Sequence, residues 1–72
     1  MFTYEWLGMP TESGIRKVID RSVISTADPK TAIAHAKDLL KGPVTFHGKK
    51  PNAVRVLNND SVLVWTGTVN DD

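Results

Sequence analysis

The chain has 72 residues, of which 40% are hydrophobic and 24% charged, with a formal net charge of +1. This length allows one small domain, and this composition excludes both an intrinsically disordered chain and a membrane-embedded one. The absence of cysteine excludes disulfides and thiolate metal sites. Because the first residues lack the basic segment and long apolar run of a signal peptide, a cytoplasmic location is expected.

The first expected element is a strand over Phe2–Leu7. Its aromatic residues occupy every second position, so they share one side of a sheet: Phe2, Tyr4 and Trp6. The other side carries Thr3, Glu5 and Leu7. The next seven residues include a proline and two glycines, and they predict a loop.

Residues 15–25 fit both a helix and a strand. A helical face would contain Ile15, Val18, Ile19, Ser22 and Val23. However, five of these eleven residues are Ile or Val, which favour strands, and we therefore favour the strand. In that strand the residues expected to point inward are Ile15, Ile19 and Val23, and a bulge is expected to accommodate Val18 and Ile24.

A helix is predicted over residues 29–41. Asp28 can accept the free amides of the first turn, and Pro29 suits the first helical position because it has no N–H to satisfy. An apolar stripe at helical spacing predicts the buried face: Ala32, Ile33, Ala36, Leu39 and Leu40. The helix is expected to end with Gly42 in the left-handed conformation, and Pro43 prevents its continuation.

The C-terminal part predicts a hairpin. Its strands, Ala53–Leu57 and Ser61–Thr66, are rich in Val, Leu and Trp, and the residues between them are Asn and Asp. The second strand is expected to continue through Thr68 and Val69. Between the helix and this hairpin, residues 44–46 predict either a short strand or an anchored loop, followed by an exposed turn.

The order of the elements is therefore strand, strand, helix, strand, strand. Two hairpins that flank one helix predict a two-layer α+β sandwich, in which the helix packs on a four-stranded antiparallel sheet. We expect one domain over residues 1–69 and a frayed tail at residues 70–72. The order of the strands within the sheet is left open.

Residues 25–66 resemble a pattern found in many short bacterial proteins: a strand pair, an acid-capped helix and a second hairpin with a polar turn. The helix motif Asp-x-x-x-Ala-Ile-x-x-Ala-x-x-Leu-Leu begins at Asp28 and ends at Leu40. The hairpin contributes Ala53–Asp60 and Leu63–Trp65 to the resemblance. The resemblance implies the α+β fold and no established activity.

Few side chains point to catalysis or to metal binding. His35 has no ligand-type residue four positions later, and His47 belongs to a loop. Ser13 lies in a turn sequence and not in a nucleophile elbow. The five glycines are scattered, and none opens the helix as a phosphate-binding loop would. We therefore expect no enzymatic activity, no cofactor and no bound metal.

Basic residues are concentrated in the middle of the chain. Residues 16–55 contain all nine basic residues and three acidic ones, a net charge of +6. Lysine and arginine can neutralise phosphates, and an aromatic ring can stack on a base. The alternative function is therefore weak nucleic-acid binding by the basic segment 41–55, which contains Phe46, with Lys49, Lys50 and Arg55 as contacts.

The last strand does not alternate apolar and polar residues. Val62–Trp65 are all apolar, so both faces of the sheet are expected to carry apolar side chains, whereas one helix can cover only one face. Three explanations remain open. The strand contains a bulge, the segment 42–52 folds over the second face with Phe46 as its anchor, or that face contacts another chain.

The third explanation predicts a function. We expect a non-enzymatic protein-interaction or self-associating domain, with a protein partner or a second copy of the chain bound to the uncovered face. The residues expected to form the contact surface are Trp6, Leu63 and Trp65.

Overall fold

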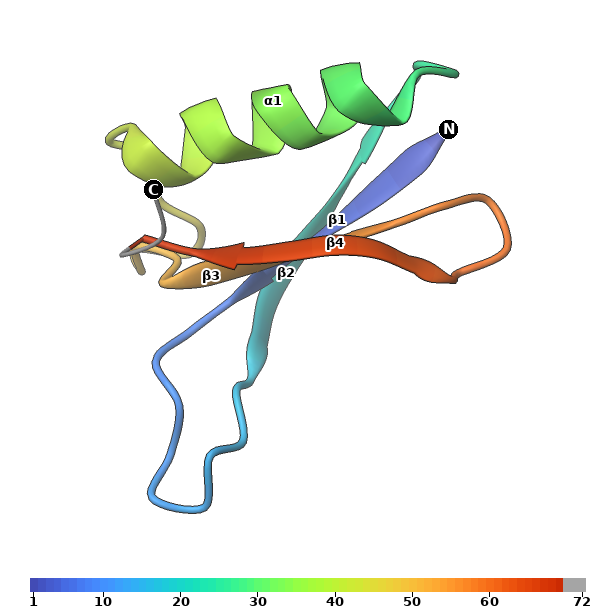
Figure 1. Cartoon of the computed structure of the whole chain (residues 1–72). Helices are drawn as coiled ribbons and strands as arrows, with labels where there is room; N and C mark the ends of the chain where they lie inside the picture. Colours follow the sequence, from blue (N-terminus) through green and yellow to red (C-terminus); the bar gives the residue numbers. More distant parts are fainter. Residues whose placement is uncertain (70–72) are drawn as a thin grey trace.

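The computed structural model describes residues 1–69, which form one four-stranded antiparallel sheet with a single helix on one face (Figure 1). The elements are β1 (Phe2–Leu7), β2 (Val18–Ile24), α1 (Pro29–Lys41), β3 (Ala53–Leu57) and β4 (Leu63–Thr68). In the sheet they follow the order β2-β1-β3-β4, so β1 and β3 are interior strands and β2 and β4 are edges. The predicted α+β sandwich is confirmed, and the expected frayed tail lies outside the described residues.

The ends of α1 show how local chemistry sets the helix. The Asp28 carboxylate accepts the Lys30 N–H at 3.0 Å and the Thr31 hydroxyl at 2.9 Å, as expected for an N-cap. At the other end of the helix, the prediction that Gly42 adopts the left-handed conformation is wrong, because Gly42 is extended at φ −79° and ψ −177°. The following Pro43 disfavours helical angles at Gly42, and the Gly42 N–H still closes the last turn on the Asp38 and Leu39 carbonyls.

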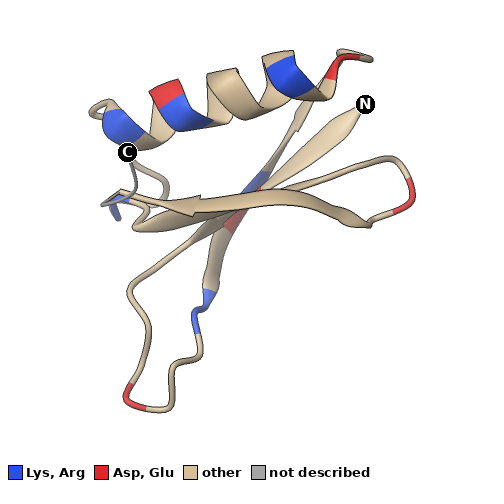
Figure 2. Ribbon diagram, viewed as in Figure 1, with Lys and Arg blue, Asp and Glu red and all other residues tan. Residues whose placement is uncertain are grey.

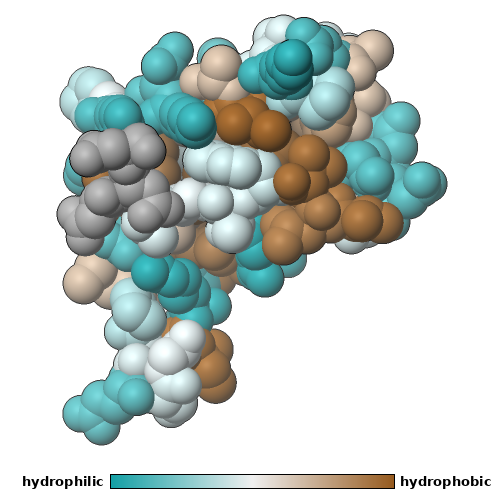
Figure 3. All heavy atoms as spheres, in the orientation of Figure 1, coloured by the Kyte–Doolittle hydropathy of each residue, from teal (hydrophilic) through white to brown (hydrophobic). Residues whose placement is uncertain are grey.

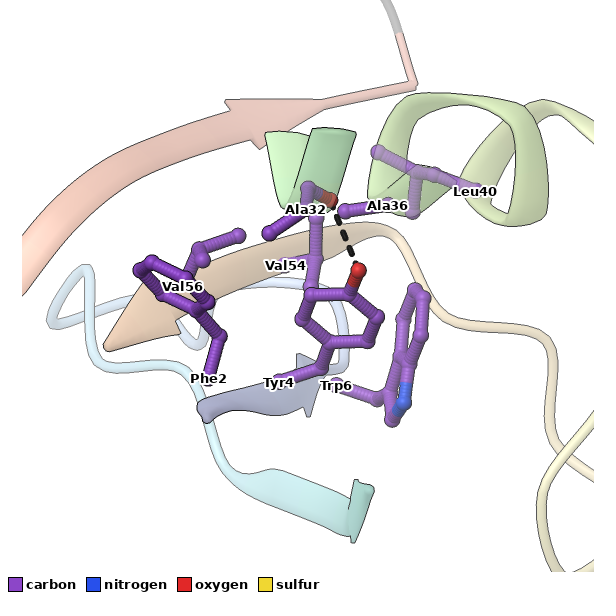
Figure 4. Close-up of a cluster of buried hydrophobic side chains, with 8 residues drawn as sticks. All are labelled: Phe2, Tyr4, Trp6, Ala32, Ala36, Leu40, Val54 and Val56. Atoms are coloured by element: carbon purple, nitrogen blue, oxygen red, sulfur yellow. Dashed lines mark hydrogen bonds between the residues drawn. The ribbon is translucent and has the colours of Figure 1, made fainter. Parts of the chain in front are cut away.

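The core lies between α1 and the sheet (Figure 4). Its buried side chains come from β1, α1 and β3: Phe2, Tyr4, Trp6, Ala32, Ala36, Leu40, Val54 and Val56. The two alanines allow the helix to approach the sheet closely, and the Tyr4 hydroxyl donates to the Ala32 carbonyl oxygen at 2.7 Å. The predicted alternation of the aromatic residues of β1 is confirmed, since all three rings are in the core.

Strand β2 confirms the strand prediction, but its inward residues differ from those expected. Ile15 precedes the strand and is 64% exposed, and Val23 is 62% exposed. Instead, Ile24 packs against the core, because it pairs with Phe2 and so shares the helix side of the sheet. The bulge falls at Ile19, where the register with β1 shifts.

A bulge also shapes the second hairpin. The Asn58 side chain accepts the N–H groups of Asp60 and Val62, which closes a turn of four residues. The register between β3 and β4 then shifts, so that Val64 is the extra residue. The bulge given as one explanation of the apolar run is therefore confirmed. Within residues 1–69 no helix is long and apolar enough to cross a membrane.

The aromatic ring of Trp65 lies along its own strand, over Gly67. A Cβ atom placed on Gly67 would lie only 2.6 Å from Trp65 Cζ2. We therefore expect Gly67→Ala to destabilise the fold by about 1–3 kcal/mol, because the ring must leave its packing against the core. Urea unfolding followed by tryptophan fluorescence measures the change.

The matched control is Gly8→Ala. The nearest side-chain atom to a Cβ on Gly8 is 3.8 Å away, an ordinary contact. An equal loss of stability in both variants would contradict the assigned position of the Trp65 ring.

Burial of Tyr4 predicts a loss of stability at high pH. Desolvation raises the pKa of Tyr4 above its usual value, so the folded state favours the neutral phenol. The contribution of the neutral Tyr4 phenol to the free energy of unfolding is fully present below the unfolded pKa of about 10. It is lost as the pH rises through the higher folded pKa. We expect Tyr4→Phe to be less stable at neutral pH by about 1–3 kcal/mol, since the Ala32 carbonyl loses its donor.

The wild type should then lose more stability than Tyr4→Phe when both are taken above pH ~10. Urea unfolding of the two proteins across the pH range checks this. If the stability curves of the two proteins are parallel across this pH range, the pKa of Tyr4 is the same in the folded and unfolded states, which contradicts the prediction.

Candidate interaction surface

The sheet face opposite α1, which we call the open face, is not covered by the segment 42–52. Phe46 stacks on Trp6 with ring centres 5.1 Å apart, and Trp6 belongs to the helix side of the sheet. His47 Nε2 lies 3.6 Å from Asp20 Oδ2 on that same side. The explanation in which this segment folds over the second face is therefore wrong. Phe46 instead extends the helix layer over the end of β1.

The antiparallel register aligns the residues of the open face in rows that cross the sheet. Each row takes one residue from each strand, in the order β2, β1, β3 and β4. One row is apolar apart from a threonine and comprises Val23, Thr3, Leu57 and Leu63. The next is polar and comprises Arg21, Glu5, Arg55 and Thr66.

The polar row contains an ion-pair network. Arg21 Nε donates to Glu5 Oε2 at 3.0 Å, and Arg55 Nε lies 3.2 Å from Glu5 Oε1, within ion-pair distance but outside hydrogen-bond geometry. The Glu5 side chain is only 15% exposed, whereas both arginines reach further into solvent. One carboxylate thus balances one of two guanidinium groups, and the centre of the open face keeps a net positive charge.

Exposed apolar side chains gather where β4 begins. Val62 is 56% exposed, Leu63 51% and Val64 37%. Figure 3 shows this apolar surface beside the helix, over the first part of β4. Leu57 adjoins Leu63 on the open face and is half-buried. We call these four residues the β4 surface: Leu57, Val62, Leu63 and Val64.

Of the three residues expected to form the contact surface, only Leu63 is exposed on the open face. Trp6 was assigned wrongly, because it is fully buried in the core. Trp65 is half-buried on the helix side, where the Lys37 ammonium lies 5.4 Å from its ring centre. Leu63 and Trp65 face opposite sides because the extra residue Val64 lies between their register positions.

The residues expected to contact nucleic acid do not share one surface. Lys49 is exposed in the loop on the helix side. Lys50 Nζ donates to the Gly42 carbonyl oxygen at 2.5 Å, at the end of α1. Arg55 lies on the open face beside Glu5. Figure 2 likewise shows basic residues distributed over the helix, the loops and the sheet.

The sequence did not indicate the pairing of Glu5 with Arg21 and Arg55. The alternation of β1 placed Glu5 away from the aromatic residues, but the partners depended on the strand order. Val62 and Val64 belong to an apolar run in the sequence, but their exposure is seen only in the structure. Among residues 1–69 no three His, Cys, Asp or Glu side chains are grouped so that they could hold a metal ion.

Comparison with protein-family models, with curated proteins and with solved structures found no match. The resemblance to short bacterial proteins therefore stays a prediction.

The ion pairs of Glu5 with Arg21 and Arg55 contribute to the stability of the fold, and this contribution can be measured. We expect Glu5→Gln to destabilise the fold by up to about 1 kcal/mol, because Arg21 and Arg55 lose their shared partner and then repel each other. The loss should shrink at high salt, which screens this repulsion. Urea unfolding at low and high ionic strength measures both effects. A loss that does not depend on salt would assign Glu5 a packing role instead.

Proposed function

We propose that this chain is a small, non-enzymatic protein-interaction domain of the cytoplasm, and that the β4 surface is its contact site. The observation that carries the proposal is the cluster of exposed apolar side chains at the start of β4, next to an open sheet face. Contiguous exposed apolar surface typically marks an interface.

Energetics supports the same proposal. Burial of one exposed valine or leucine side chain contributes roughly 1.5–3 kcal/mol when it is complete, so the three exposed residues of the β4 surface offer a substantial gain. A 72-residue domain buries only about 60% of its unfolded surface and is marginally stable by itself. A bound partner would add to this stability by mass action.

The adjoining polar row suggests what the partner offers. Arg55 and Thr66 lie next to the β4 surface on the open face. A matching partner therefore presents apolar side chains with acceptor oxygens beside them. The nucleic-acid alternative has no comparable support, since its three residues are divided between the two sides of the sheet.

A pair of lysine variants tests the proposal. Leu63 and Val23 lie in the same row, at opposite edges of the sheet, with similar exposure. We expect immobilised wild type and Val23→Lys to retain a common protein from an extract of the source cells, and Leu63→Lys to retain at least about tenfold less of it. Mass spectrometry identifies and quantifies the retained protein, with the chain itself counted among the candidates.

Circular dichroism and urea unfolding should first show that both variants are folded. Equal retention by Leu63→Lys and by wild type would overturn the proposal. So would the absence of any protein that wild type retains.

A further inference from the structure

We infer that Arg55 binds a carboxylate of the partner protein, and that the partner segment carrying this carboxylate places apolar side chains on Leu57 and Leu63. This inference rests on the proposed function, because it names the chemistry that the β4 surface and the polar row beside it recognise. It follows from the unequal pairing of Arg21 and Arg55 with Glu5.

Glu5 accepts a hydrogen bond from only one of its two arginines. Its Oε2 atom accepts from Arg21 Nε at 3.0 Å. Arg55 Nε lies 3.2 Å from Glu5 Oε1, yet this nitrogen is buried and has no hydrogen-bond partner. Within residues 1–69 the Arg55 guanidinium donates no hydrogen bond, although its side chain is 40% exposed. Its planar set of N–H donors is therefore available to an acceptor from outside the chain.

No acidic side chain competes for Arg55 on the side of β4. Its cross-strand neighbour there is Thr66, whose hydroxyl donates to the Val54 carbonyl oxygen at 3.2 Å. Residues 61–69 contain no charged residue, and Figure 2 shows β4 without a charged side chain along its length. The one acid between residues 53 and 68 is Asp60, which lies in the turn. The positive charge of Arg55 is therefore uncompensated toward β4.

Apolar side chains adjoin this charge on the same face. Leu57 follows Arg55 by two residues, which places the two side chains about 7 Å apart on one side of the strand. Leu63 pairs with Leu57 across the hairpin and is 51% exposed. A ligand that satisfies both features carries a carboxylate about 7 Å from an apolar group. A segment of a protein with an acidic residue between apolar residues has this form.

The charge of the site matches a carboxylate better than a phosphorylated side chain. Arg21, Glu5 and Arg55 together carry one net positive charge, and a carboxylate carries one negative charge. A phosphorylated side chain carries nearly two negative charges and is normally bound by several arginines.

The open face also lacks the aromatic surface that a nucleic acid would need. Bases stack on aromatic rings, and all five aromatic residues of the chain belong to the layer on the helix side: Phe2, Tyr4, Trp6, Phe46 and Trp65. The open face therefore offers an anion contact and apolar contacts, but no ring for stacking.

The two kinds of contact have different roles. An ion pair between exposed groups adds little affinity, so the apolar side chains on Leu57 and Leu63 supply most of it. The Arg55 guanidinium selects a partner with an acid at the right place, because it can hold both oxygens of a carboxylate at once. Arg55 is thus a specificity determinant of the β4 surface.

A peptide titration tests this assignment. The probe is the end-blocked peptide Leu-Ala-Glu-Ala-Leu, whose extended form places the glutamate about 7 Å from each leucine on one side. Its counterpart has glutamine in place of glutamate. Heteronuclear NMR follows the Arg55 Nε–H resonance and the backbone amides of β3 and β4. We expect the glutamate peptide to shift both, and the glutamine peptide to bind about fivefold more weakly.

Two variants locate the effect. Arg55→Gln should bind the glutamate peptide about fivefold more weakly than wild type does. Lys49→Gln is the matched control, because it removes the same charge from the loop on the helix side, and it should bind as wild type does. Circular dichroism should first show that both variants are folded.

Equal binding of the two peptides by wild type would overturn the inference. An equal loss in Arg55→Gln and Lys49→Gln would also overturn it, as would the absence of binding of either peptide. The comparison of the two peptides uses wild type alone, so it does not depend on the folding of a variant. The proposed function is tested separately by Leu63→Lys, and a partner held by apolar contacts alone would satisfy it.

Discussion

A sheet has two faces, and this chain has one helix to cover them. The helix lies close to the sheet because Ala32 and Ala36 are small, and the Tyr4 hydroxyl of β1 donates to the Ala32 carbonyl oxygen of the helix. The loop that follows the helix adds Phe46 to the same layer. All of the large rings therefore gather on one side, and the other side has to be stabilised by different means.

The open face is stabilised partly by charge. Glu5 is held between Arg21 and Arg55 on neighbouring strands, and this network occupies the centre of a surface that no helix covers. The network keeps that centre polar and positively charged, so it disfavours close packing against a second sheet. The exposed apolar residues of the open face lie in the row beside it, from Val23 at the β2 edge to Leu63 where β4 begins. Charge thus determines which part of an uncovered face remains available to a partner.

The sequence predicted most of the fold because local signals agreed with one another. The Asp28 cap, the helical stripe and the alternating aromatic residues of β1 each describe a single element. The cap and the alternation were confirmed, and so was the stripe except for Ile33, which is half-buried outside the core. The candidate contact surface was predicted less well. Trp6 and Trp65 were expected on the uncovered face because their strands carry apolar residues on both sides, but both rings pack on the helix side. Leu63 was the one residue of the three that lies on the open face.

The sequence by itself determined the elements, their order and the two-layer architecture, since capping, periodicity and turn chemistry act over a few residues. Only the tertiary structure decided which strands are neighbours and which side chains face outward. A bulge adds one residue to one strand, and that residue reverses the faces of everything beyond it. The sequence indicated that bulges could be present, but their positions at Ile19 and Val64 depend on pairing with distant strands. The open face and its ion pairs are consequences of that pairing.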